Sequence, residues 1–182
     1  MNDAKKVLSY YQETFRDWGH SVDALSWEDE KKQRLRFRVL CEVLPQTPCT
    51  LLDVGCGFGD LYQYLRDEGF EHVQYTGIDL MPEFTAIAQK RFPGVPFITG
   101  DFHHLEQPFD AVLASGPFSI KVSDNETMIR LAIDKLWQLS RKFLALNLLS
   151  MQAPSTARFD DYYYYDPQAV LEFVCTFCSQ TR

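Results

Sequence analysis

The chain has 182 residues, of which 46% are hydrophobic, 14% aromatic and 24% charged, a composition typical of one folded globular domain. Its first residues lack the apolar core of a secretion signal, and no apolar run approaches the roughly 18 residues needed to span a bilayer. The net charge of −7 repels phosphate backbones and anionic membranes. We therefore expect a soluble, cytoplasmic protein that acts on a small molecule and binds neither nucleic acid nor membrane, in an unknown oligomeric state.

Residues 1 to 45 are expected to be helical and to precede the main body of the fold. Ser26 is a suitable N-cap for a helix with acidic residues at 28 to 30 in its first turn, and this helix is expected to end near Pro45. Apolar residues at one helical spacing form its buried stripe: Phe37, Leu40, Cys41 and Leu44. Its basic residues are interpreted as a solvated face paired with preceding acids at i,i+4: Lys31, Lys32, Arg34, Arg36 and Arg38.

From residue 49 onward, short apolar runs alternate with amphipathic stretches. The strand-like runs are 49–54, 72–79, 96–99, 109–115 and 142–150. Helical patterns cover 59–68, 82–92 and 125–141, and a last helix is expected to begin at Asp166 and Pro167. This alternation predicts an α/β fold of the doubly wound kind, with a mainly parallel sheet and helices on both faces.

A glycine-rich loop directly follows the first strand. Gly55, Gly57 and Gly59 lie at the carboxyl end of the predicted sheet, where such folds bind ligands, although a tight turn alone would also explain them. Dinucleotide-binding loops carry a third glycine at the position of Asp60, close to the pyrophosphate. Because a carboxylate would repel a pyrophosphate, the loop favours a ligand that has no phosphate and carries a cationic group. S-adenosyl-L-methionine is such a ligand.

Four segments in order resemble the motifs of class I S-adenosylmethionine-dependent methyltransferases: DVGCGFG, YTGIDL, FITGDF and FDAVLASGPF. The resemblance covers about residues 49 to 150 and implies a Rossmann-like sheet of strand order 3-2-1-4-5. It further implies a single domain over residues 1–182, with 1–45 as a helical extension or lid and 46–182 as the core. The family's usual sixth and seventh strands have no counterpart, so we expect a truncated chain or an exposed fifth strand.

The resemblance also implies a role for individual residues. Asp79 would accept hydrogen bonds from both ribose hydroxyls, Asp101 and Phe102 would face the adenine amino group and ring, and Asp53 would support the glycine loop near the methionine amino group. The full set of expected cofactor-binding residues is Asp53, Gly55, Cys56, Gly57, Asp79, Leu80, Met81, Asp101, Phe102 and Ser115.

Candidate catalytic residues are few, because methyl transfer needs a general base only when the nucleophile must lose a proton. His103 and His104 follow the third strand and have a suitable intrinsic pKa, and Tyr11 lies in the expected lid. Tyr10, Tyr11 and Tyr162–Tyr165 could cage a substrate or the sulfonium through cation–π contacts, or they pack on the sheet. The segment Ser115–Phe118 lacks the Asn or Asp and the first proline of amino-group methyltransferases, which argues against nucleic-acid or glutamine amino groups as acceptors.

We interpret the chain as a methyltransferase that acts on a small molecule with S-adenosyl-L-methionine. The alternatives are an NAD(P)-dependent oxidoreductase, which Asp60 disfavours, and a non-catalytic protein that binds S-adenosylmethionine. Cys175 and Cys178 are interpreted as buried helix cysteines rather than as part of a metal or redox site, because no second pair accompanies them. The odd count of five cysteines implies no disulfide framework and suits the reducing cytoplasm.

Overall fold

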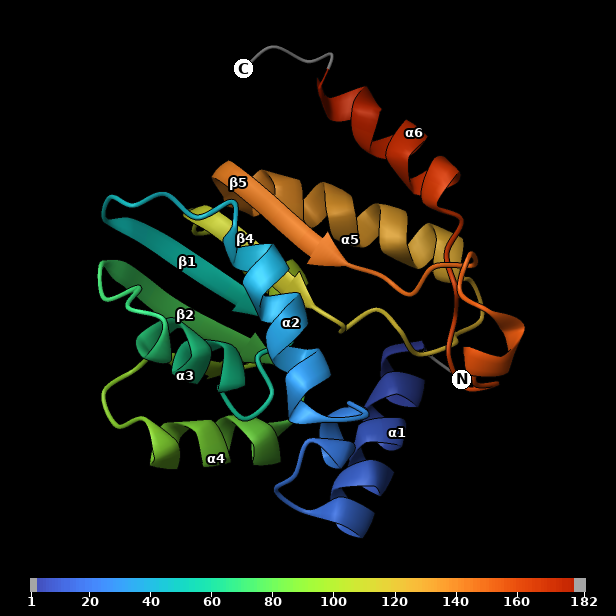
Figure 1. The fold of residues 1–182 in the computed structure, drawn as a ribbon, viewed down its shortest axis with the longest axis horizontal. Helices are drawn as coiled ribbons and strands as arrows, with labels where there is room; N and C mark the ends of the chain where they lie inside the picture. The colour runs from blue at the N-terminus through green and yellow to red at the C-terminus, as the bar shows by residue number, and fades with distance from the viewer. Residues whose placement is uncertain (1–2, 179–182) are drawn as a thin grey trace.

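A parallel five-stranded sheet forms the centre of the protein in the computed structural model, which describes residues 3–178 (Figure 1). Its strand order is β3-β2-β1-β4-β5, which confirms the predicted order and fold class. The strands are β1 (Cys49–Val54), β2 (Val73–Asp79), β3 (Phe97–Thr99), β4 (Phe109–Ser115) and β5 (Ser140–Asn147). Because the order reverses between β1 and β4, the chain leaves a crevice at the carboxyl ends of these two strands.

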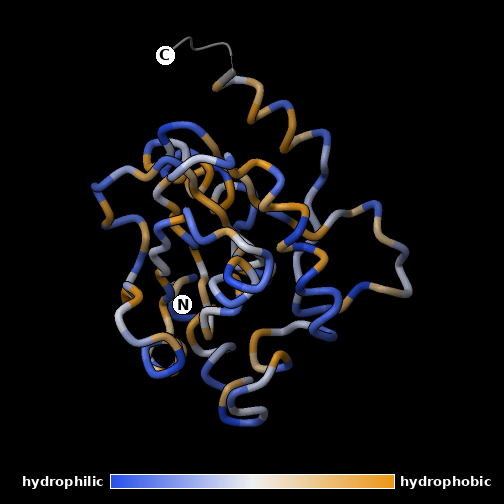
Figure 2. Tube along the Cα trace, turned by 60° about the vertical axis from the view of Figure 1, so that its left-hand side comes forward, coloured by the Kyte–Doolittle hydropathy of each residue, from blue (hydrophilic) through white to orange (hydrophobic). Residues whose placement is uncertain are grey.

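Helices cover both faces of this sheet. The α-helices are α1 (Asp3–Trp18), α2 (Glu30–Cys41), α3 (Asp60–Asp67), α4 (Pro82–Arg91), α5 (Asn125–Leu139) and α6 (Pro167–Cys178). Short 3-10 turns add η1 (Asp23–Leu25), η2 (Phe102–His104) and η3 (Ser155–Ala157). Residues of α2, α3 and α4 share one core cluster, those of α5 and α6 share the other, and α6 projects beyond the sheet (Figures 1 and 2).

The central strands are apolar along their length because both of their faces are covered. Leu51 and Leu52 of β1 and Val112 of β4 have no exposed surface, and alternate residues enter the two clusters. Hydrophobic segments accordingly gather in the interior, while hydrophilic segments lie mostly on outer turns and loops (Figure 2). Burial of this apolar area is the main favourable term for the sheet, and it fixes which strand ends meet at the crevice.

The predicted start of α2 was wrong, although its buried stripe is confirmed. Asp29, not Ser26, is the N-cap, and its side chain accepts a hydrogen bond from the Lys32 amide at 2.7 Å. Ser26 instead ends η1 in a left-handed conformation, with φ of 60°. The helix ends at Cys41, before the predicted boundary at Pro45.

The basic residues of α2 do not form one solvated face. Lys32 pairs with Glu28 at i,i+4 as predicted. Arg34 instead crosses to α3, where it binds two adjacent carboxylates, Asp67 at 2.9 Å and Glu68 at 3.0 Å. The pKa of Arg34 is raised, chiefly by the hydrogen bond to Asp67.

The last helix begins with Asp166 and Pro167 as predicted, and the Gln168 amide donates to the Asp166 carboxylate at 2.9 Å. The prediction of buried cysteines was wrong for Cys175, which is exposed on α6. The side chain of Cys178 lies outside the described residues. No helix between residues 3 and 178 combines the length and apolar character needed to cross a bilayer.

Candidate functional site

The glycine loop bends sharply between β1 and α3. Gly55 and Gly57 have φ values of 75° and 54°, in the left-handed region that favours glycine. A Cβ at Gly55 would lie 2.7 Å from Cβ of Pro117, and one at Gly57 would lie 2.9 Å from a methyl carbon of Leu25. Both positions therefore favour glycine for conformation, and Gly55 also requires it for space because the Pro117 ring is rigid.

Asp79, at the end of β2, joins this loop to the start of α4. One of its carboxylate oxygens accepts from the Gly57 amide at 2.9 Å and the other from the Met81 amide at 2.9 Å. Burial raises the pKa of Asp79, and these backbone hydrogen bonds oppose the rise. The carboxylate is thus fixed where a hydroxyl-bearing ligand could donate to it.

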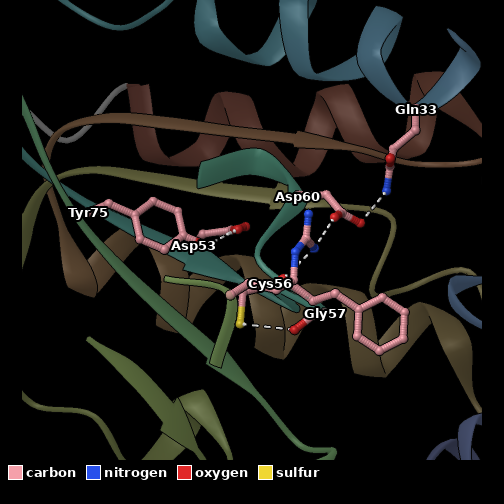
Figure 3. A network of polar contacts seen from close by, with 8 residues as sticks. Gln33, Asp53, Cys56, Gly57, Asp60 and Tyr75 are labelled. Carbon is pink, nitrogen blue, oxygen red and sulfur yellow. Dashed lines mark hydrogen bonds and ion pairs between the residues drawn. The ribbon is translucent and has the colours of Figure 1, made fainter. Parts of the chain in front are cut away.

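A second buried carboxylate, Asp53, lies behind the loop (Figure 3). The Tyr75 hydroxyl donates to it at 2.6 Å. Burial raises the pKa of Asp53 to about 7, the hydrogen bond from Tyr75 lowers it, and the charges of Asp79 and Asp60 raise it. The Cys56 thiol is also buried, which raises its pKa well above the usual value, so this side chain is not a reactive thiolate.

Asp60 is the third member of this group of carboxylates (Figure 3). It pairs with Arg91 of α4 at 2.6 Å and accepts from the Gln33 amide group of α2 at 3.3 Å. Arg91 also donates to the Phe58 carbonyl at 2.7 Å. Asp60 therefore connects the loop to two helices. The sequence predicted that its carboxylate would face the position of a phosphate, but in the structure Arg91 largely neutralises its charge.

On the other side of Asp79, Asp101 caps η2. Its carboxylate accepts from the His103 amide at 2.9 Å and contacts the His103 ring nitrogen at 2.8 Å. Burial raises the pKa of Asp101, but the hydrogen bonds and charge of His103 outweigh this and lower it overall. The Phe102 ring lies 4.1 Å from the His103 ring, centroid to centroid.

The glycine loop and the carboxylates Asp53, Asp60, Asp79 and Asp101 line one cavity of about 630 Å³, within the usual range for a small-molecule site. All ten expected cofactor-binding residues line it, and so do Tyr11 and His103. His104 is exposed and is not one of the lining residues. Sequence reasoning did not predict the lining residues Leu25, Trp27 and Arg36, which α2 and the turn before it contribute.

Contacts with distant parts of the chain hold α1 beside the cavity, which α1 helps to line. The Tyr10 hydroxyl lies 3.2 Å from the Tyr162 hydroxyl and 3.1 Å from that of Ser26. Tyr11 packs edge-on against Phe84, with 6.1 Å between ring centroids. Burial, followed by the charge of Asp79, raises the pKa of Tyr11, so its phenol stays protonated at neutral pH.

The parallel sheet, the glycine loop and the carboxylate after β2 define a Rossmann-like protein that binds a nucleoside-containing cofactor. The cavity fits S-adenosylmethionine, because its carboxylates suit hydroxyl and cationic groups and its loop leaves the backbone accessible.

Comparisons with known proteins identify the family. Residues 51–139 match the family described as "Methyltransferase domain". The chain is 33% identical over 132 residues to Rv1506c of Mycobacterium tuberculosis, whose name describes it as a methyltransferase. The match covers 69% of this chain and 78% of that protein. It is 32% identical over 127 residues to demethylmenaquinone methyltransferase of Thermotoga maritima, covering 68% of this chain and 53% of that enzyme.

Solved structures share the fold. Magnesium protoporphyrin IX methyltransferase of Synechocystis, with bound S-adenosylhomocysteine, matches with a TM-score of 0.72 at 16% identity and covers 96% of this chain and 88% of that one. A Burkholderia thailandensis 1,6-didemethyltoxoflavin-N1-methyltransferase matches with a TM-score of 0.69 at 22% identity, over 94% and 76% of the two chains. The chain belongs to the class I S-adenosylmethionine-dependent methyltransferases, and its cofactor is S-adenosylmethionine.

Proposed function

We propose that the methyl acceptor is a small molecule that binds in the same cavity as the cofactor. The observation that carries this proposal is the continuity of the cavity. Beyond the glycine loop it extends along apolar and aromatic side chains, including Trp27, Phe118, Ile120, Leu148 and Tyr162. A concave, mostly apolar extension suits a small molecule better than a polymer, and a 1,6-didemethyltoxoflavin is bound in the Burkholderia relative.

We further propose how the cavity holds the cofactor. Asp79 would accept from the ribose hydroxyls, Asp101 and Phe102 would face the adenine, and the Gly55–Gly57 backbone with Ser115 would hold the methionine portion. Leu80 and Met81 would border the adenine, although Met81 is buried against Phe58 and Phe84 and also serves the core. The cofactor, when bound, supplies a methyl group already activated by its sulfonium.

The remaining role of the protein is to orient the acceptor and to exclude water. Tyr11 would act as a neutral hydrogen-bond donor rather than as a base, because its raised pKa keeps the phenol protonated. His103 is held by Asp101 at the proposed adenine end, and His104 lies outside the cavity. These positions favour an acceptor that needs no histidine base.

The domain organisation is part of the same proposal. Residues 1–45 would act as a lid over a core formed by residues 46–182, and the contact between Tyr10 and Tyr162 supports a closed arrangement. The buried free thiols of Cys41, Cys49 and Cys56 support a reducing compartment such as the cytoplasm.

The test uses S-adenosylmethionine carrying a labelled methyl group. The protein is incubated with a cell extract divided by ultrafiltration into small molecules and macromolecules, and label transfer is followed together with S-adenosylhomocysteine formation. We expect transfer in the small-molecule fraction. Label in the macromolecular fraction alone would overturn the proposed acceptor class.

A further inference from the structure

Arg36 on α2 is partly buried and has no anionic partner among residues 3–178, whereas the unpaired Lys31 and Arg38 are exposed. Lys32 is paired with Glu28, and Arg34 with Asp67 and Glu68. Arg36 lines the cavity instead, and no residue in the described part of the chain forms an ion pair or hydrogen bond with its guanidinium.

The surroundings of Arg36 make this lack of a partner costly. Its guanidinium lies over the Trp27 ring, 4.7 Å from the ring centroid. Burial lowers its pKa, and the charge of Glu28 opposes this only in part. Since a desolvated charge is unfavourable unless it is paired, a ligand anion at this position would be stabilised. Contact with the Trp27 ring uses none of the N–H donors of the guanidinium, which match a planar, two-oxygen acceptor.

The position of this pair in the cavity indicates which part of a ligand it would meet. A Cβ added to Gly116 would lie 3.4 Å from the Trp27 ring, and Gly116 directly follows β4. Arg36 and Trp27 therefore lie by the carboxyl end of β4, near the proposed methionine and acceptor positions. The carboxylates of Asp53, Asp79 and Asp101 line the same cavity and would repel a polyanion. A single carboxylate can pair with the guanidinium and brings only one negative charge near these aspartates.

We propose that Arg36, oriented by Trp27, binds a carboxylate of a ligand in this cavity. The proposal rests on the proposed function, in which cofactor and acceptor share the cavity. Two ligands could supply the carboxylate: the amino-acid end of the cofactor or an acidic acceptor. Both would present the same planar group to the same guanidinium.

The experiment compares Arg36→Gln with the wild type by isothermal titration calorimetry. The first arm titrates S-adenosylhomocysteine and its decarboxylated analogue, which keeps the amine. The second arm titrates benzoate and neutral benzamide into the protein saturated with S-adenosylhomocysteine. Arg38→Gln is the matched control, because it makes the same change on an exposed position of α2. Thermal unfolding of each variant verifies folding.

A cofactor carboxylate at Arg36 predicts that Arg36→Gln binds S-adenosylhomocysteine at least about tenfold more weakly, with the decarboxylated analogue unaffected. An acceptor carboxylate predicts unchanged S-adenosylhomocysteine affinity and benzoate binding, absent for benzamide, that Arg36→Gln abolishes. Arg38→Gln should match the wild type in both arms. The proposal is overturned if Arg36→Gln matches the wild type in both arms. Failure of the wild type to bind S-adenosylhomocysteine would instead contradict the cofactor placement.

Discussion

At the scale of single residues, Asp79 has two functions in one carboxylate, because it holds the glycine loop and is the proposed ribose acceptor. Asp79→Asn keeps the size but removes the charge and turns an amide N–H toward a backbone donor. We expect affinity for S-adenosylhomocysteine to fall by more than about tenfold, since hydrogen bonds to a charged group contribute about 1.5 to 3 kcal/mol. Calorimetry measures this, with Asp67→Asn on the surface as the control. Equal affinity in Asp79→Asn would contradict the proposed ribose contact.

Asp53 leads to a prediction about pH. Its pKa of about 7 in the folded protein lies above the value of 3.8 for an unperturbed Asp, so between these values the folded state holds a proton that the unfolded state has lost. Stability from this group is therefore present at low pH and is lost as pH rises through about 7. The difference in free energy of unfolding between Asp53→Asn and the wild type should therefore grow in favour of the variant by about 1 kcal/mol or more between pH 5 and pH 8.

Urea unfolding at the two pH values measures that difference. Asparagine still accepts the Tyr75 hydrogen bond, so packing behind the loop is retained. A constant difference between wild type and variant across the range would show that Asp53 does not titrate there.

Arg36 shows what the sequence could have indicated and did not. It is spaced three residues after the buried Gln33 and four before the buried Leu40, so it lies on the inward face of α2. The cluster of five basic residues obscured this spacing, because charge runs are usually solvated. Its stacking on Trp27 depends on a non-periodic turn and could not be predicted from local pattern.

At the scale of elements, the Asp60–Arg91 pair couples the glycine loop to α4. Both side chains are mostly buried, with 20% and 28% of their surface exposed, so the pair is less screened by solvent than a surface pair. We expect Asp60→Asn and Arg91→Gln each to weaken S-adenosylhomocysteine binding, with little further loss in the double variant. The coupling energy should be about 1 kcal/mol in a double-mutant cycle. Arg66→Gln, which removes an exposed ion pair with Glu71, is the control.

Strictly additive losses in that cycle would mean that the two residues act independently. Retained secondary structure in each variant, by circular dichroism, separates loop positioning from unfolding.

The elements themselves were predicted to within a few residues, because each strand and helix carries its own periodic pattern. β1 and β4 match their predicted bounds, whereas β5 begins at Ser140 instead of residue 142. The start of α2 was missed for a physical reason: η1 is too short to show a period, and Ser26 fits an N-cap pattern while ending that turn. The order of the motifs identified the sheet, but not which helices lie beside the loop.

At the scale of the whole molecule, the cavity draws its walls from Asp3 at one end of the described chain to Tyr164 near the other. The contact between Tyr10 and Tyr162 joins segments 152 residues apart. No local pattern encodes such a contact, so the shape of the cavity could not be predicted from the sequence. A ligand that binds here should therefore stabilise segments distant from the glycine loop.

Hydrogen exchange with and without S-adenosylhomocysteine tests this coupling. At about 100 times the dissociation constant, binding should add about 2.7 kcal/mol to the free energy of unfolding, because the ligand binds only the folded state. We expect protection to increase in α1 and around Tyr162 as well as in the glycine loop, since the proposed lid closes on the Tyr10–Tyr162 contact. Tyr10→Phe should reduce the gain in α1 alone, whereas Tyr163→Phe, whose hydroxyl bonds Glu126 outside the cavity, should not. Protection confined to the glycine loop would show that α1 closes independently of the ligand.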